Sequence, residues 1–266
     1  MQTNLTIALA QLEIVTDPAV NYSKAEIFAR QASLQGADII VFPEMFMGLP
    51  APDRPPIKIV ENDGGTFIER LKTLSSEMDL SITAGCWEDS QDSQRVYNTI
   101  YTIFPEGRTV ATYRKIHLFD ALSVSESDTM VPGNALPPVV EIAGFRIGFA
   151  ICYDLRFPEL FRYLSRQGAQ LVIVPSAWYQ GPMKEDHWLT LLRARAIENT
   201  FYVAGCNLIG PSFCGRSSLF DPFGVQLASA GEEETLLIGK INTDRIDVVR
   251  QKLPCLLNRR SDLLPG

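Results

Sequence analysis

The chain has 266 residues, of which 46% are hydrophobic, and this is enough to build one large core in a single domain over residues 1–266. Its formal net charge of -7 and its lack of a Lys/Arg run argue against a nucleic-acid partner. No apolar stretch approaches the roughly 20 residues that a membrane helix needs. Five cysteines without close pairing, and an N-terminus without signal-peptide features, predict free thiols and a cytoplasmic location.

The hydrophobic pattern alternates between strands and helices along the whole chain. Expected strands cover residues 5–12, 39–42, 81–87, 96–104, 109–113, 139–142, 146–151, 171–174, 201–206, 217–220, 225–230 and 236–241, and expected helices cover 21–35, 67–78, 158–166, 186–199 and 244–251. The segments 105–107 and 143–144 are typical of hairpin turns. Hairpins combined with βα units predict an α/β fold in which two mixed sheets face each other with helices outside.

Three of the apolar runs end on a reactive side chain. Glu44 follows the strand at 39–42, Lys115 follows the strand at 109–113, and Cys152 follows the strand at 146–151. Ligands of open α/β sheets bind beyond the carboxyl ends of the strands. If the three strands are neighbours, a base, a cation and a nucleophile meet in one pocket. These are the three groups that attack on an amide carbonyl requires.

Cys152 is the strongest candidate for a nucleophile because it lies on a strand-to-helix elbow. Such a position lowers the pKa of a thiol from about 8.5 by stabilising the thiolate. The remaining thiols fit the ordinary role of a buried small hydrophobe, and they are Cys86, Cys206, Cys214 and Cys255.

Lys115 and Glu44 are weaker evidence when each is taken alone. Most lysines are solvated surface residues, but apolar residues follow Lys115, and a lysine beside carboxylates stays protonated and can stabilise an oxyanion. Glu44 also lies among apolar residues, where a carboxylate is costly unless it is paired, and it is suited to act as a general base. A structural ion pair remains the alternative for both side chains.

The segments Pro43–Phe46, Tyr113–Asp120 and Cys152–Leu160 closely resemble the Glu-Lys-Cys motifs of the nitrilase, or carbon–nitrogen hydrolase, superfamily. This resemblance implies a four-layer αββα sandwich and a homodimer, with the C-terminal tail from about residue 250 at the interface. It implies that Glu44 is the base, Lys115 the oxyanion stabiliser and Cys152 the nucleophile, and that Glu126 orients Lys115. It also implies that neither a metal nor a cofactor takes part, and that the partner is a small-molecule amide.

The residues around Cys152 and the later loop indicate a branch of this superfamily. Cys152-Tyr153-Asp154 is similar to the amidase branches, and residues 175–178 and 181–188 are most similar to deaminated glutathione amidases. The implied reaction releases 2-oxoglutarate and cysteinylglycine through a thioester, with the Tyr153 backbone N–H on the oxyanion. An omega-amidase acting on 2-oxoglutaramate is the alternative.

Several side chains are candidates for contacting the substrate. Trp178 is expected to line the pocket, although an aromatic residue after a strand often belongs to the core. Lys184 is expected to pair with a substrate carboxylate, although taken alone it reads as an exposed loop lysine. Other candidate cations, which structural ion pairs with acids such as Glu159 or Glu198 also explain, are Arg156, Arg193 and Arg195.

Two other interpretations remain open at this point. A catalytically silent binding protein on the same fold has no use for a buried ionic trio. An acyltransferase passes the thioester to an amine in place of water. His117 fits a hydrogen-bonded core residue better than a papain-type catalytic base.

Overall fold

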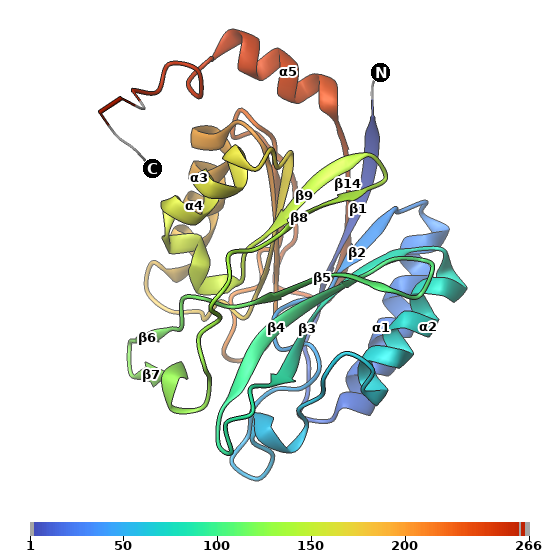
Figure 1. The fold of residues 1–266 in the computed structure, drawn as a ribbon. Helices are drawn as coiled ribbons and strands as arrows, with labels where there is room; N and C mark the ends of the chain where they lie inside the picture. The colour runs from blue at the N-terminus through green and yellow to red at the C-terminus, as the bar shows by residue number, and fades with distance from the viewer. Residues whose placement is uncertain (1–2, 261, 264–266) are drawn as a thin grey trace.

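Two mixed six-stranded sheets form the centre of the molecule, described here from a computed structural model of residues 3–260, 262 and 263 (Figure 1). The first sheet has the order β14-β1-β2-β3-β4-β5, with β1 (Asn4–Gln11), β2 (Ile39–Val41), β3 (Ser81–Asp89), β4 (Val96–Ile103), β5 (Thr109–Arg114) and β14 (Thr235–Asn242). The second has the order β13-β12-β11-β10-β9-β8, with β8 (Val139–Ile142), β9 (Phe145–Phe149), β10 (Leu171–Ser176), β11 (Tyr202–Asn207), β12 (Ser218–Phe220) and β13 (Gln226–Ser229). In each sheet the middle strands are parallel and the outer ones antiparallel.

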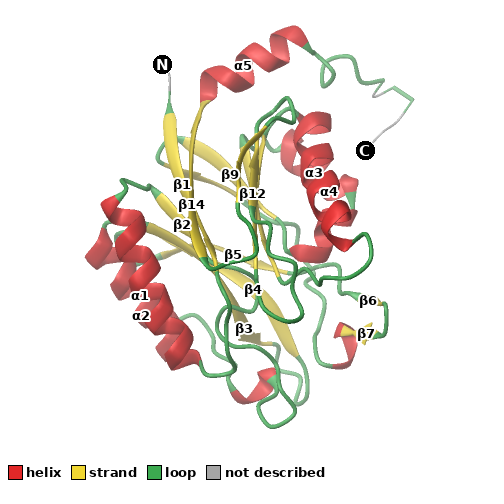
Figure 2. Ribbon diagram, turned by 180° about the vertical axis from the view of Figure 1, so that it is seen from behind, coloured by secondary structure: helices red, strands yellow, loops and turns green. Residues whose placement is uncertain are grey.

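Helices cover the outer face of each sheet and complete the predicted αββα sandwich. The helices α1 (Pro18–Leu34) and α2 (Thr66–Met78) lie against the first sheet, and α3 (Pro158–Arg166) and α4 (Lys184–Asn199) lie against the second (Figures 1 and 2). The helix α5 (Thr243–Lys252) lies at one end of the sandwich, near the start of β1 (Figure 1). No helix among the described residues is long and apolar enough to cross a membrane.

The alternation of side chains in β1 shows how the sequence builds these layers. Leu5, Ile7 and Leu9 belong to the core between the two sheets, whereas Ala8 and Ala10 face the helices of the first sheet. This is the two-residue period of a strand that is buried on both faces. Small alanines on the helix side and larger residues between the sheets therefore set the spacing of the layers.

The three strands before Glu44, Lys115 and Cys152 are not neighbours, so the condition stated for their meeting in one pocket is not met. The strands β2 and β5 are separated by β3 and β4, and β9 belongs to the other sheet. The three side chains nevertheless converge because the sheets pack face to face. Short elements absent from the predicted set also contribute, namely β6 (Asp120–Ala121), β7 (Val124–Ser125) and the 3₁₀ turns Pro56–Lys58, Glu126–Asp128 and Cys152–Arg156.

Candidate active site

Glu44 is held at a tight turn that follows β2. The next residue, Met45, has a φ of 59°, and the turn packs directly on Gly85 of β3, where a Cβ atom would lie 2.6 Å from the Met45 backbone nitrogen. The Asn98 amide of β4 donates to Oε1 of Glu44 at 2.7 Å, and the Ala177 backbone N–H donates to Oε2 at 2.7 Å. Both oxygens of this buried carboxylate are therefore fixed by partners from the two sheets.

Lys115 lies between two buried carboxylates. Its Nζ is 2.9 Å from Oε1 of Glu44, and it lies 2.9 Å and 2.8 Å from the two oxygens of Glu126. Burial alone disfavours the ammonium, but the two carboxylates outweigh it and hold the pKa of Lys115 well above its usual value. Lys115 is therefore a fixed positive charge in a site without bulk water.

Glu126 begins a 3₁₀ turn and accepts a hydrogen bond from the Phe119 backbone N–H at 2.7 Å. That bond connects the loop after β5 to the carboxylate that holds Lys115. Burial raises the pKa of Glu126; Lys115 opposes this rise, and the nearby charge of Glu44 adds to it. Glu126 thus fixes the direction in which the ammonium points.

Cys152 lies at a backbone elbow between β9 and a 3₁₀ turn, with a φ of 45° that is rare for a residue other than glycine. The prediction of a lowered thiol pKa is wrong. Burial raises the pKa of Cys152 well above its usual value, the negative charge of Glu44 adds to the rise, and Lys115 offsets it only in part. These effects therefore favour the neutral thiol of Cys152 over the thiolate.

Asp154 fixes the elbow, and sequence reasoning did not assign it a role. Its Oδ2 accepts hydrogen bonds from the Tyr113 hydroxyl at 2.8 Å and from the Ile151 backbone N–H at 2.9 Å. Its Oδ1 accepts from the His117 backbone N–H at 3.2 Å and lies 2.7 Å from the Nδ1 of His117. Because Tyr113 and His117 flank Lys115 in sequence, Asp154 ties the thiol segment to the lysine segment.

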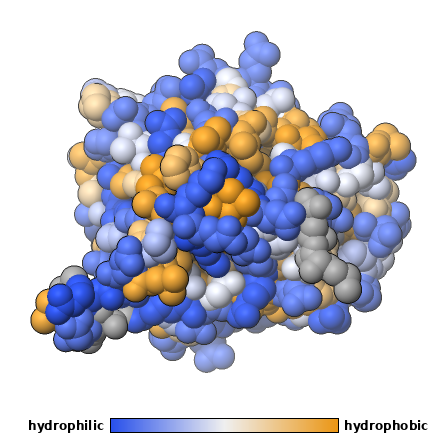
Figure 3. Space-filling model, turned by 90° about the horizontal axis from the view of Figure 1, so that it is seen from above, coloured by the Kyte–Doolittle hydropathy of each residue, from blue (hydrophilic) through white to orange (hydrophobic). Residues whose placement is uncertain are grey.

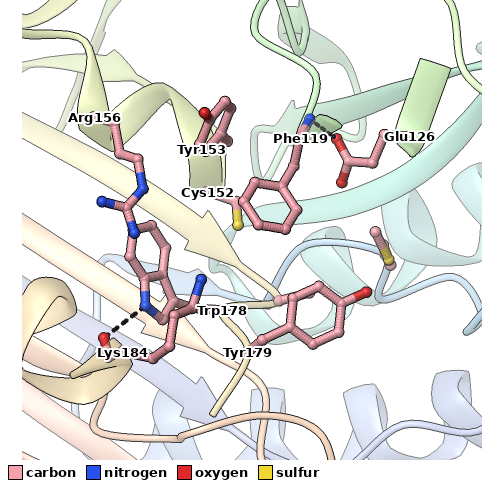
Figure 4. Close-up of a pocket in the computed structure, with 10 residues that line it drawn as sticks. Phe119, Glu126, Cys152, Tyr153, Arg156, Trp178, Tyr179 and Lys184 are labelled. Carbon is pink, nitrogen blue, oxygen red and sulfur yellow. Dashed lines mark hydrogen bonds between the residues drawn. The ribbon is translucent and has the colours of Figure 1, made fainter. Parts of the chain in front are cut away.

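The thiol of Cys152 opens into a small cavity (Figure 4). Phe119, Glu126, Tyr153 and Tyr179 form part of its wall, and the aromatic rings enclose the sulfur. The free volume is about 10 Å³, close to that of one water molecule. The aromatic side chains therefore leave little free space beside the thiol.

Two cations and an indole ring form the other side of this cavity (Figure 4). The Trp178 ring is buried, its Nε1 donates to the Lys184 backbone oxygen at 2.8 Å, and its centroid lies 4.9 Å from the Lys184 Nζ and 4.7 Å from the Arg156 Cζ. The interpretation of Lys184 as an exposed loop residue is wrong, because only 7% of it is exposed. The expectation of a structural ion pair holds for Arg195, which lies 3.0 Å from Glu198, whereas Arg156 faces the cavity.

His117 is hydrogen-bonded as expected, but it lies at the edge of the core, because 29% of its side chain is exposed. Its ring stacks on Phe157 with centroids 3.6 Å apart, and its Nδ1 faces Asp154, as described above. Among the described residues, His, Cys, Asp and Glu form no group of three that could hold a metal ion.

Comparison with known proteins gives consistent matches over nearly the whole chain. The family model described as carbon–nitrogen hydrolase matches residues 6–251. The chain is 39% identical to the deaminated glutathione amidase of a Synechocystis strain over 94% of this chain and 97% of the relative. It is 33% identical to the human omega-amidase NIT2, over 98% and 97% of the two chains.

A solved structure with the same fold carries a covalent group on its active site cysteine. It is a Glu-to-Gln mutant of the amidase from Nesterenkonia sp. AN1, which shows covalent addition of the acetamide moiety of fluoroacetamide at the active site cysteine. The TM-score is 0.84 at 27% identity, covering 99% of this chain and 96% of that one.

Proposed function

Since the chain belongs to the carbon–nitrogen hydrolase family and is an amide hydrolase, we propose that it works through a thioester on Cys152 with Glu44, Lys115 and Glu126 as its partners. The observation that carries this proposal is their convergence in one buried cluster whose sulfur faces a cavity. A catalytically silent relative would have to support two buried carboxylates and an ammonium without using them, although such groups are costly to bury.

The mechanism follows from the charges of the cluster. Glu44 accepts the thiol proton while the Cys152 sulfur attacks the amide carbon, and the carbonyl oxygen becomes an oxyanion. Lys115 and the Tyr153 backbone N–H stabilise that oxyanion, with Glu126 holding Lys115 in place. Glu44 then gives its proton to the leaving nitrogen as the C–N bond breaks. A water molecule, deprotonated by Glu44, hydrolyses the thioester and restores the thiol.

The proposed substrate is deaminated glutathione, which is cleaved to 2-oxoglutarate and cysteinylglycine. This compound carries one carboxylate on each side of the scissile amide, and the cavity of this acidic protein presents two cations, Arg156 and Lys184. The second candidate is an omega-amidase that acts on 2-oxoglutaramate, which the similarity to a relative of that name supports. Its substrate has one carboxylate and releases ammonia.

Turnover of the two substrates tests the proposal. We expect a higher kcat/KM on deaminated glutathione than on 2-oxoglutaramate, measured as 2-oxoglutarate released. A strong preference for 2-oxoglutaramate would support the omega-amidase instead. Cys152→Ala should abolish both activities while keeping the circular dichroism spectrum and the melting temperature near those of the wild type. A Cys152→Ala enzyme with near-normal activity would exclude the thioester mechanism.

We further propose that the protein is a homodimer that uses the surface next to α5. Apolar side chains lie exposed in and after this helix, including Val248, Leu253 and the 86%-exposed Leu257, and apolar atoms are visible on this side of the molecule (Figure 3). Exposed apolar residues gathered in this way mark interaction surfaces. Light scattering should give twice the mass of one chain, and Leu257→Glu should shift the protein toward the monomer. A monomeric wild type would contradict the proposal.

A further inference from the structure

A second cavity of about 440 Å³ adjoins the small cavity of Cys152. The two share Phe119, Tyr179 and Lys184 as common walls. The remaining wall of the larger cavity is mostly apolar and includes Leu122 and Val124 from the hairpin β6–β7. The proposed reaction involves residues that line the small cavity, and it assigns no part of the substrate to the larger cavity.

Lys184 is an unpaired cation at the junction of the two cavities. Its residue is 93% buried, and the Nζ lies 4.9 Å from the ring centroids of both Phe119 and Trp178. No described carboxylate forms an ion pair with it, and burial together with the charge of Arg156 lowers the pKa of Lys184. A buried ammonium held only by aromatic faces is incompletely satisfied, and an anion from a ligand would complete its surroundings.

Another cavity that adjoins the cavity of Cys152 is a poorer place for an anion. It has a volume of about 320 Å³ and shares Met45, Glu126 and Tyr179 with the cavity of Cys152. Its described lining contains no lysine, arginine or histidine, and it includes the Glu126 carboxylate. A negatively charged group would therefore be repelled there and attracted on the Lys184 side.

We propose that the larger cavity is the subsite for the leaving group and that Lys184 binds a carboxylate on the leaving amine. This inference rests on the proposed amidase function. Arg156 lines only the cavity of Cys152, so it is placed to meet the carboxylate of the acyl half. The enzyme then selects amides whose nitrogen belongs to a short acidic peptide over primary amides, because only the former fill the cavity and pair with Lys184.

A binding cycle separates this role of Lys184 from a general effect of its charge. The ligands are deaminated glutathione, its analogue with a C-terminal glycinamide, and 2-oxoglutaramate. Each is titrated calorimetrically into Cys152→Ala, which cannot cleave them, and into Cys152→Ala with Lys184→Gln. Lys184→Arg keeps the charge, and Lys240→Gln, which removes an exposed lysine of β14, is the matched control in the same background.

In the Cys152→Ala protein, the acid should bind about tenfold more tightly than the glycinamide, the usual gain from a charge-assisted hydrogen bond. Lys184→Gln should remove that difference, whereas Lys184→Arg should retain most of it and Lys240→Gln all of it. Equal binding of acid and glycinamide, or an equal loss of affinity for all three ligands in Lys184→Gln, would overturn the inference. Binding is measured without cleavage, so it tests the role of Lys184 separately from the proposed function. If the wild-type enzyme hydrolysed none of these amides, the proposed function would be refuted, and the binding comparison would still decide whether Lys184 binds the carboxylate.

Discussion

Gly85 is the residue whose replacement most directly tests how the fold positions Glu44, the proposed base. In Gly85→Ala, the new Cβ would lie 2.6 Å from the Met45 backbone nitrogen, 2.7 Å from the Pro43 carbonyl oxygen and 2.8 Å from the Glu44 Cα. Because a comfortable contact is about 3.5 Å, the turn that carries Glu44 would have to retreat by roughly 0.7 to 0.9 Å. The hydrogen bonds of Glu44 at 2.7 to 2.9 Å would then open beyond about 3.4 Å and largely be lost.

Both stability and catalysis should respond to this displacement. Overpacking of a closed interior costs about 1–3 kcal/mol of the free energy of unfolding. A displacement approaching 1 Å in a catalytic group can cost on the order of 10²-fold in kcat, because the base no longer lies on the thiol proton. We therefore expect Gly85→Ala to fold, to melt at a lower temperature and to lose most of its kcat.

The control is Gly231→Ala, which makes the same substitution where no heavy atom lies within 4 Å and the backbone needs no positive φ. Urea denaturation gives the stability change, and steady-state hydrolysis gives kcat. If Gly85→Ala kept wild-type kcat with Glu44 still in place, the packing of the turn on β3 would have no part in positioning the base.

Three further predictions concern the cluster itself. Lys115→Met should lower kcat by on the order of 10²-fold or more, the usual loss for one oxyanion donor, and an effect confined to KM would contradict that role. Because burial and Glu44 raise the pKa of Cys152, its thiolate fraction grows with pH through and above neutrality. The rate of alkylation of Cys152 by iodoacetamide, measured by mass spectrometry of the Cys152 peptide, should therefore rise continuously from pH 6 to about pH 9. A plateau of this rate below pH 7 would indicate a lowered pKa instead. Asp154→Asn should destabilise the fold by about 1–3 kcal/mol, because on either side the new NH2 group would face a backbone N–H, of Ile151 or of His117, that loses its acceptor. The Tyr113 hydroxyl and the His117 ring nitrogen can instead accept from that NH2 group. Urea denaturation checks this against exposed Asp244→Asn, and equal stabilities would remove Asp154 from the support of the elbow.

The layers of the fold could be predicted because they follow from periodicity, which is local. The strand β1 alternates between two kinds of buried side chain, and α1 repeats Ala25, Phe28, Ala29 and Ala32 on its buried face. Each of these patterns is visible within a single short segment of the sequence. The order of strands depends on contacts between distant segments, and for this reason the sequence left open whether β2, β5 and β9 are neighbours, which they are not.

The positions of the reactive residues could also be read from the sequence, but their electrostatics could not. Glu44, Lys115 and Cys152 each follow a strand, and the resemblance of their motifs indicated Glu126. The pKa of Cys152 depends on burial and on a carboxylate more than 100 positions away, so the elbow alone gave the wrong direction. Asn98 and Asp154 carry no local signal of their own, because an amide or acid near a strand end is common.

The charge balance of the buried cluster explains why a neutral thiol is the useful resting form. Glu44 and Glu126 bring two negative charges against the single positive charge of Lys115, so a resting thiolate would add a third negative charge in a buried site. Transfer of the proton from Cys152 to Glu44 leaves the net charge of the cluster unchanged, whereas its release to solvent would not. In the proposed mechanism, the attack creates a negative charge on the substrate oxygen next to Lys115. Once Glu44 is protonated, it neutralises the charge of Lys115 less. The same arrangement that suppresses the thiolate at rest therefore strengthens the stabilisation of the oxyanion when it forms.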